Sequence, residues 1–374
     1  MAGIYIHIPF CKSRCIYCGF FSTTSLALRD DYVRAVCQEL QLRRDELAGQ
    51  CVETIYFGGG TPSQLSLHHI SQILETIYNI YNVRVREVTL ECNPDDANEC
   101  LQQLRTLGVN RLSMGVQTFD EARLRFLHRR HTATQAVDAV RMAQKTGFNN
   151  ISIDLMFGFP KQTLAEWKQD VNTALSLGVQ HLSAYSLMYE EGTLLERLMS
   201  QGEVEELDEE TSLAMYEYLL DATAAAGFEQ YEISNFAQPG MQSLHNSAYW
   251  HGIPYLGIGA GAHSYDGQTR QFCPDSLADY LEGIRQGVVP LQQEVLTTTE
   301  RYDEFVFTAL RTRCGLDMAE LNRRFGQTLY DYCLKNAQNH IEQGRLHYVA
   351  GRLRLSRKGL FVSNDIMSDL MWTD

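Results

Sequence analysis

The chain has 374 residues, of which 44% are hydrophobic and 21% are charged. This composition is typical of a soluble globular protein, and the length allows one large domain of barrel size together with a smaller one. The formal net charge of -14 argues against an extended nucleic-acid-binding face, because such a face requires a surplus of basic side chains.

The location of the protein in the cell is predicted from the lack of an apolar span or leader pattern and from the cysteines. No run of about 18 apolar residues occurs, so no membrane span is predicted. Ten cysteines are irregularly spaced, and no secretory leader pattern precedes the first apolar run. Together these features predict a cytoplasmic protein with reduced thiols. Peripheral membrane contact and oligomerisation stay open.

The first chemically distinctive segment lies near the N-terminus. A short apolar run from Gly3 to Ile8 predicts a strand, and it leads into Cys11, Cys15 and Cys18. Structural zinc takes four protein ligands, and no fourth Cys or His is evident nearby. Iron-sulfur clusters use the same thiolates, usually four, so three cysteines predict a cluster with one iron left open. The alternative is that these are buried free thiols, a common environment for cysteine.

From Gly3 to Met188 a short apolar run, a Gly-rich or polar motif and an amphipathic segment alternate. The pattern predicts strands at 3–8, 52–57, 87–91, 111–116, 151–156 and 181–188, and helices that include 31–46, 67–81, 134–145 and 164–177. Six such units predict an α/β fold, a partial (β/α)6 TIM-like barrel with the helices outside a parallel sheet. Chemistry in such folds lies at the C-terminal ends of the strands.

The predicted strand ends carry polar or glycine residues. They are Gly59, Gly60 and Thr61 after the second strand, Glu91 in the third, Gln117 in the fourth and Asp154 in the fifth. For each residue alone a capping or turn role is the alternative. Cys92 follows Glu91 and points to the opposite face of its strand, which makes Cys92 a poor candidate for a fourth cluster ligand.

After Met188 the regular alternation of strand-like and helix-like segments changes. The sequence predicts a helix at 208–226, a strand at 229–236, a glycine-rich loop at 257–264, helices at 299–311 and 330–343, and a hairpin at 345–356. The two helices at 299–311 and 330–343 and the hairpin at 345–356 predict a small C-terminal helical, winged-helix-like domain. Its basic residues fit a solvated face better than a nucleic-acid contact. We therefore expect a barrel core at 1–190, a barrel-completing region at 191–295 and a C-terminal domain at 296–374.

Four segments together resemble the oxygen-independent coproporphyrinogen III dehydrogenase family of radical SAM proteins. They are YIHIPFC at 5–11, GGGTP at 58–62, RLSMGVQ at 111–117 and DLMFGFP at 154–160. The resemblance implies that Cys11, Cys15 and Cys18 hold a 4Fe-4S cluster. It also implies that S-adenosylmethionine (SAM) is bound by Gly59, Gly60, Thr61, Glu91, Gln117, Arg129 and Asp154, with Tyr5 and Tyr17 beside them. Arg130 is the adjacent alternative to Arg129, and a guanidinium at either position would pair with a carboxylate.

The family has two branches, and the sequence distinguishes them. The dehydrogenases carry a further cysteine two residues after the third and a long N-terminal extension. Here Phe20 occupies that position, and ten residues precede Cys11. The haem-chaperone (HemW-type) branch is marked by the motif His-Asn-x-x-Tyr-Trp, which this chain matches at 245–250. Gly19 departs from that branch, which often has an acidic residue there.

The resemblance therefore implies a protein that binds haem and delivers it. His245 would ligate the haem iron, and neighbouring aromatic rings would lie against the macrocycle. The expected partners are haem-acceptor proteins, such as those of a respiratory chain, and a low-potential electron donor such as flavodoxin or ferredoxin. The alternative function is conversion of coproporphyrinogen III by a 5'-deoxyadenosyl radical. A third is an interaction protein that keeps the cluster only for structure.

Overall fold

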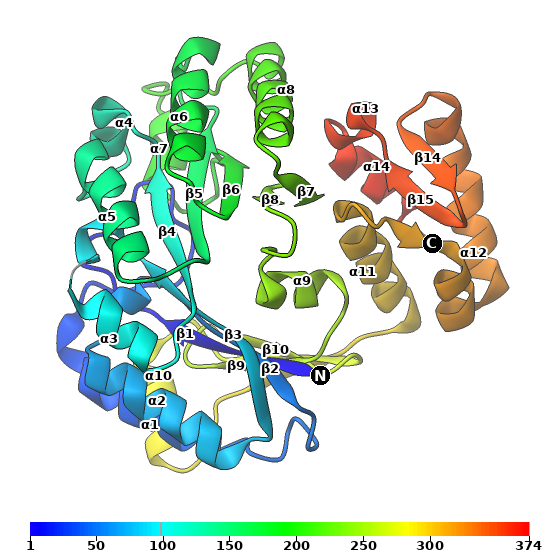
Figure 1. Ribbon diagram of the computed structural model, residues 1–374. Helices are drawn as coiled ribbons and strands as arrows, with labels where there is room; N and C mark the ends of the chain where they lie inside the picture. The colour runs from blue at the N-terminus through cyan, green and yellow to red at the C-terminus, as the bar shows by residue number, and fades with distance from the viewer. Residues whose placement is uncertain (98, 374) are drawn as a thin grey trace.

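The computed structural model describes residues 1–97 and 99–373 and contains a strongly curved sheet with helices on its outer side (Figure 1). Six neighbouring strands run parallel and follow the chain order. They are β1 (Ala2–Ile8), β2 (Val52–Gly59), β3 (Val83–Cys92), β4 (Arg111–Gln117), β5 (Ile151–Phe157) and β6 (His181–Ser186). The predicted partial barrel is thus confirmed.

Helices follow the strands, and most of them bury their apolar faces in the core that covers the sheet. They are α1 (Arg29–Leu42), α2 (Leu67–Ile80), α3 (Cys100–Thr106), α4 (Glu121–Phe126), α5 (Ala133–Lys145), α6 (Leu164–Ser176), α7 (Leu194–Ser200) and α8 (Glu209–Ala225). Local sequence fixes where several of them begin. In α5 and α6 a threonine and a Gln or Glu three residues later satisfy each other's backbone donors at the helix start.

The sheet continues beyond β1 on one side and beyond β6 on the other. Next to β1 lie β9 (Tyr255–Ile258), β10 (His263–Tyr265), β11 (Thr269–Phe272) and β12 (Gln292–Val295), and next to β6 lie β8 (Asn235–Ala237) and β7 (Glu229–Glu232). The sheet order begins with β12 and ends with β7, so among the described residues the barrel does not close.

The helix expected at 330–343 begins earlier, at Met318, with a kink at Gly326. Two other predicted elements differ from the structure in kind. The single strand expected at 229–236 is a pair, β7 and β8, because a turn intervenes in which the Glu232 carboxylate accepts a hydrogen bond from the Ser234 N–H at 3.0 Å. The loop expected at 257–264 is the end of β9, a turn and the start of β10. Glycine at 257 allows this, since a Cβ there would collide with the backbone of His263.

A second, smaller core follows the barrel. It is built from α11 (Thr298–Arg311), β13 (Leu316–Asp317), α12 (Met318–Glu342), β14 (Leu346–Val349), β15 (Arg352–Leu355), α13 (Arg357–Leu360) and α14 (Ser363–Leu370). Its three strands form an antiparallel sheet in the order β13-β15-β14. This arrangement confirms the predicted hairpin and the small helical C-terminal unit. The limits at residues 190 and 295 stay a prediction.

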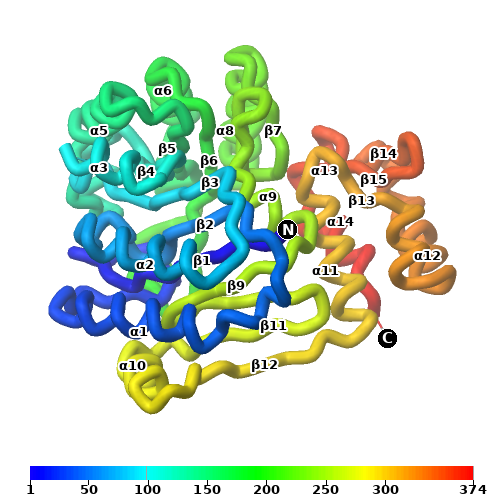
Figure 2. The backbone as a smooth tube through the Cα atoms, turned by 60° about the horizontal axis from the view of Figure 1, so that its bottom comes forward, coloured from blue at the N-terminus to red at the C-terminus, as the bar shows by residue number. Residues whose placement is uncertain are grey.

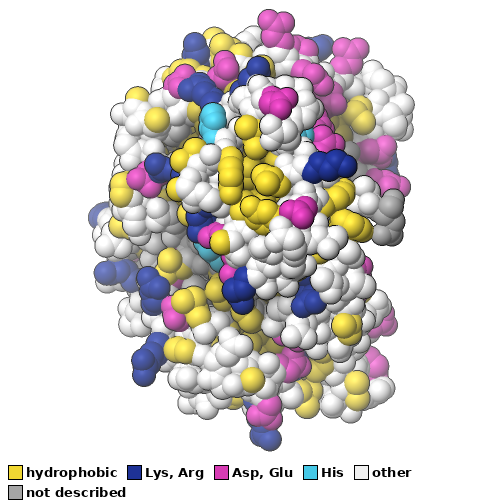
Figure 3. All heavy atoms as spheres, turned by 90° about the vertical axis from the view of Figure 1, so that its right-hand side faces the viewer, with side chains coloured by type: hydrophobic (Ala, Val, Ile, Leu, Met, Phe, Trp, Pro, Cys, Tyr) yellow, Lys and Arg dark blue, Asp and Glu magenta, His cyan; other side chains and the backbone are white. Residues whose placement is uncertain are grey.

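The surface of the C-terminal side is mixed in character. Figure 3 shows hydrophobic side chains gathered near the middle of this face, with basic and acidic side chains around them. Within residues 1–97 and 99–373, none of the helices combines the length and the apolar character that a bilayer crossing requires.

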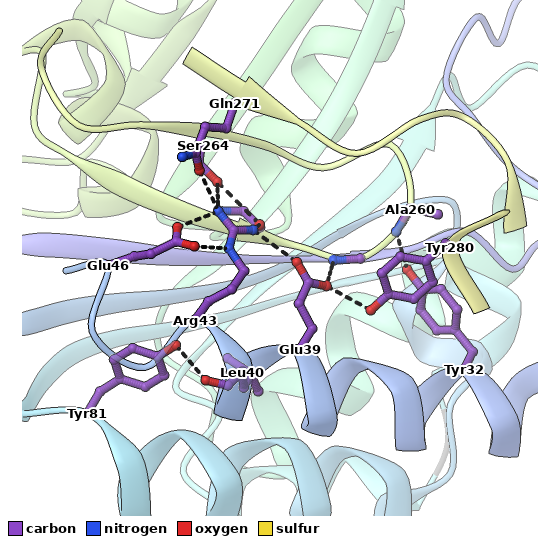
Figure 4. Close-up of polar contacts among 12 residues, drawn as sticks. Tyr32, Glu39, Leu40, Arg43, Glu46, Tyr81, Ala260, Ser264, Gln271 and Tyr280 are labelled. Atoms are coloured by element: carbon purple, nitrogen blue, oxygen red, sulfur yellow. Dashed lines mark hydrogen bonds and ion pairs between the residues drawn. The ribbon is translucent and has the colours of Figure 1, made fainter. Parts of the chain in front are cut away.

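A buried ion pair connects α1 to the added strands (Figure 4). Arg43 donates to Glu39 at 2.9 Å, to Glu46 at 2.7 Å and to the Gly257 carbonyl at 2.7 Å. The other oxygen of Glu39 accepts from the Gly259 N–H at 2.8 Å and from the Tyr280 hydroxyl at 2.7 Å. Both charged groups are therefore compensated, which is the condition for burying them.

Candidate functional site

A cavity of about 430 Å³ opens at the C-terminal ends of the parallel strands. Of the thirteen residues predicted for the site, eleven line this cavity. They are Cys11, Cys15, Tyr17, Cys18, Gly59, Gly60, Thr61, Glu91, Gln117, Arg129 and Asp154. The sheet register explains the convergence, since Ile8 pairs with Gly59, Gly115 pairs with Asp154, and both pairs lie at the same edge.

The cysteine loop follows β1. Cys11 is buried and Cys15 and Cys18 are half-buried, and all three are free thiols that face one cavity. The Cys11 N–H donates to the Thr23 carbonyl at 2.9 Å, which holds the start of the loop. Burial raises the pKa of the Cys11 and Cys18 thiols. Bound iron would offset this cost, because a metal stabilises the thiolate.

The donor set fits an iron-sulfur cluster better than a single metal ion. Within 1–97 and 99–373, no group of three His, Cys, Asp or Glu side chains is arranged to hold a metal ion. A four-iron cluster needs no common point, because each cysteine binds a different iron. Three thiols around one cavity therefore suit a cluster and leave one iron for another ligand.

The glycine turn after β2 lies directly against the cysteine loop. Gly59 has φ of 106°, a conformation that residues with a Cβ rarely adopt. A Cβ on Gly60 would lie 3.0 Å from Cys11 Sγ and 2.9 Å from the Ile8 carbonyl oxygen. The two glycines therefore let the backbone approach whatever occupies the cavity.

Gln117 has an unusual backbone. Its φ is 69°, in the left-handed region, and the β4–β5 register shifts between Gly115 and Gln117. Such a conformation costs of order 1 kcal/mol or more for a residue with a side chain, and bulges often re-aim side chains at functional sites. Here Gln117, although almost fully buried, contributes to the cavity wall.

Of the four carboxyl residues that line the cavity, Glu91 and Asp154 lie on the strands themselves. Burial raises the pKa of Glu91 to about 7, against the effect of the Tyr56 hydroxyl, which donates to it at 2.7 Å. Burial also raises the pKa of Asp154, although hydrogen bonds with Ser183 and Ser113 act the other way. Both groups are thus placed to accept hydrogen bonds from a polar ligand.

The two adjacent arginines differ in their partners. Arg129 Nη2 donates to the Asn93 side-chain oxygen at 2.7 Å and to the Gly115 carbonyl. Its Nη1 lies 3.5 Å from Cys15 Sγ. Arg130 forms ion pairs with Asp95 and Asp96. Of these two arginines, only Arg130 forms ion pairs with carboxylates among the described residues, so the charge of Arg129 is left for a ligand.

Tyr5 and His245 are the two predicted residues outside this cavity. The Tyr5 ring is stacked 6.4 Å from the ring of His245, which belongs to α9 (Leu244–Trp250). His245 is 1% exposed, with Nδ1 2.8 Å from Thr54 Oγ1 and Nε2 2.9 Å from the Tyr249 hydroxyl. Burial lowers its pKa to about 3. Ligation of haem by His245 stays a prediction, and in this conformation both ring nitrogens are occupied.

Arg111 is a charged residue that the sequence reasoning missed. It begins β4 and is 1% exposed, and its Nε and Nη1 have no hydrogen-bond partner within the described residues. Its charge acts to lower the pKa of Glu91 and of Asp154. The available signal was an arginine at the start of a strand that contains no other charged residue.

Comparison with known proteins gives the family. The sequence model of the Radical SAM superfamily matches residues 5–174, and that of the HemN C-terminal domain matches residues 296–362. "Heme chaperone HemW" of Bacillus subtilis is 36% identical over 98% of each chain. The mitochondrial "Radical S-adenosyl methionine domain-containing protein 1" of Bos taurus is 34% identical over 99% of this chain and 87% of its own.

A solved structure supports the fold. Coproporphyrinogen III oxidase (HemN) from Escherichia coli, described as a radical SAM enzyme, superposes with a TM-score of 0.85 at 23% identity, covering 99% of this chain and 90% of its own. At that identity the likeness is one of fold. Together with the full-length relatives and the two family matches, it leads to one conclusion: the chain belongs to the HemW branch of the coproporphyrinogen III oxidase-like family of radical SAM proteins.

Proposed function

We propose that this protein is a haem chaperone that binds haem and passes it to haem-requiring acceptor proteins. The observation that carries the proposal is the similarity, over nearly the whole chain, to relatives named "Heme chaperone HemW". The His-Asn-x-x-Tyr-Trp motif at 245–250 supports it, as does Phe20 at the position where the dehydrogenases carry a further cysteine. The acceptors include proteins of a respiratory chain, and a low-potential donor such as flavodoxin or ferredoxin supplies electrons.

The cavity at the strand ends is the proposed cluster and SAM site. Cys11, Cys15 and Cys18 would hold a 4Fe-4S cluster, which in this superfamily supplies one-electron reduction of bound SAM. The glycine turn provides backbone groups at close approach, and Glu91, Gln117 and Asp154 provide acceptors for amine and hydroxyl groups. Arg129 is the cation placed to meet a ligand carboxylate.

The contrast between the two arginines gives a test of this site. Arg129→Ala is expected to weaken SAM binding about tenfold to a hundredfold, because a charge-assisted hydrogen bond contributes about 1.5–3 kcal/mol. Arg130→Ala, which removes a guanidinium already paired with Asp95, is expected to change binding less than threefold. Equilibrium dialysis of SAM against anaerobic, cluster-reconstituted protein measures both.

Iron and sulfide content must be measured in the same samples, since Arg129 lies close to Cys15. If Arg130→Ala proves the more damaging variant at equal cluster content, the assignment of Arg129 to the ligand carboxylate is wrong.

Haem binding tests the proposed function directly. Ferric haem titrated into anaerobic, cluster-reconstituted protein should give a Soret band that saturates at a fixed stoichiometry. Haem should then move to a haem-free respiratory protein faster than from serum albumin at the same haem concentration. The opposite result is no saturable haem binding together with conversion of coproporphyrinogen III in the presence of SAM and a low-potential donor. That outcome would replace the chaperone with the dehydrogenase.

A further inference from the structure

A second and larger cavity, of about 1100 Å³, lies between the barrel and the C-terminal unit. Its barrel side is formed by the end of α9 and by β9 to β11, and its other side by α11, the start of α12 and β15. Figures 1 and 2 show α9 beside α11, and residues of the two helices are in contact. This cavity and the cysteine cavity share no lining residue.

The walls of the second cavity are rich in aromatic rings. Four belong to the barrel side and three to the C-terminal side: Tyr249, Trp250, Tyr255 and Tyr265, and Phe305, Phe307 and Phe325. Facing aromatic walls suit a large, flat, apolar ligand, and a volume near 1000 Å³ is at the upper end for small-molecule sites. The indole N–H of Trp250 is buried and has no acceptor within the described residues.

The same cavity is basic, although the chain is acidic. Five arginines and three carboxylates line it: Arg270, Arg301, Arg324, Arg352 and Arg354, and Glu304, Asp317 and Glu320. Arg301 and Arg354 form no ion pair among the described residues. Arg301 donates two long hydrogen bonds of 3.4 Å, to the Thr297 carbonyl and to Thr298 Oγ1. Arg354 donates to the Cys314 carbonyl at 3.2 Å. Two guanidinium groups are therefore available to carboxylates of a ligand.

His251, the residue after the motif, supplies a ligand for iron. Its Nδ1 lies 2.6 Å from the Ser247 carbonyl oxygen, which can only accept, so Nδ1 carries the proton and Nε2 keeps its lone pair. The side chain is exposed in the cavity wall, and Nε2 has no partner among the described residues. A metal-binding histidine is commonly oriented in this way, by donation from its other nitrogen to a backbone carbonyl. Both ring nitrogens of His245 already have hydrogen-bond partners, so neither is free to bind iron in this conformation.

The geometry points to this second cavity as the haem site, with His251 Nε2 as an axial ligand, the aromatic walls against the macrocycle, and Arg301 and Arg354 beside the propionates. The inference rests on the proposed haem-chaperone function. In this arrangement His245 is a positioning residue, because its hydrogen bond to Tyr249 and its contact with Thr54 fix the helix that carries the cavity wall.

Haem titration of the full-length, cluster-reconstituted protein tests the site. His251→Ala should weaken haem binding at least about tenfold and shift the Soret band, and added imidazole should restore the band position by replacing the lost side chain. His347→Ala is the matched control, since His347 is an exposed histidine on β14 outside both cavities. It should leave binding unchanged. Arg301→Ala combined with Arg354→Ala should weaken binding while keeping the Soret position.

Other outcomes would overturn the inference. Wild-type affinity and Soret position in His251→Ala would exclude His251 as ligand. Imidazole rescue of His245→Ala, but not of His251→Ala, would reverse the assignment in favour of His245. Displacement of SAM by haem at equilibrium would place haem in the cysteine cavity. In all these cases the wild type still binds haem, and the chaperone function stands. Failure of the wild type to bind haem would overturn the function itself.

Discussion

Replacement of Cys11 by alanine is expected to abolish the brown absorbance of anaerobically prepared protein and to reduce its bound iron and sulfide to near zero. The reason is the donor set, since a cluster held by three thiolates loses a third of its protein ligands with this change. Cys11 is also the most deeply buried of the three, so no solvent ligand readily replaces it. Iron and acid-labile sulfide assays, together with the visible spectrum, measure the effect.

Cys92 provides the control. It also lines the cavity, at the end of β3, but it packs in the hydrophobic core, and burial raises the pKa of its thiol. Cys92→Ala should therefore retain a full complement of iron and sulfide. Full cluster content in Cys11→Ala, or loss of the cluster only in Cys92→Ala, would refute the ligand assignment.

The site at the strand ends could be predicted from the sequence because parallel strands share one direction. Once the apolar runs are recognised as successive parallel strands, their following residues must meet at one edge of the sheet. Cys11, Gly59, Glu91 and Asp154 therefore converge whatever the details of packing. Local signals, such as the threonine caps of α5 and α6, fix the helices between them.

The remaining features depend on tertiary contacts that no local pattern contains. The sequence could place Gln117 at a strand end but not its positive φ, which follows from the bulge against β5. The resemblance favoured Arg129 over the adjacent Arg130, but the sequence could not show that Asp95 and Asp96 pair with Arg130. The burial of His245 likewise results from its contact with Thr54, a residue far away in the chain.

The second cavity was missed for the same reason. Its walls come from α9, β11, α11 and β15, and only folding brings these segments together. The short helix α9 takes part in both sites, since Asn246 lines the cysteine cavity while Tyr249 and Trp250 line the second. The motif at 245–250 therefore supplies residues to both cavities from one short helix, because its successive side chains face different sides. A ligand in either cavity contacts the same seven-residue helix.

Arg43→Met is expected to lower the free energy of unfolding by about 3–5 kcal/mol, because it leaves a buried carboxylate without its cation. The Glu39 side chain is 0% exposed and the Arg43 side chain 2% exposed in the network of Figure 4. Urea denaturation followed by circular dichroism measures the loss. Arg34→Ala is the control on the same helix, where an exposed pair with Asp31 contributes at most about 1 kcal/mol.

The pH dependence of this variant gives a further check on the cause. Burial already raises the pKa of Glu39, and without Arg43 nothing of opposite charge counteracts that burial. The folded variant then binds a proton that the unfolded chain releases at neutral pH, so its stability falls as pH rises and recovers as pH is lowered. The deficit relative to the wild type should therefore shrink between neutral and mildly acidic pH. Adding Glu39→Leu to Arg43→Met should also recover stability, because it removes the unpaired charge. If the loss of stability is independent of pH and is unchanged in the double variant, then lost packing, and not the buried charge, causes the destabilisation.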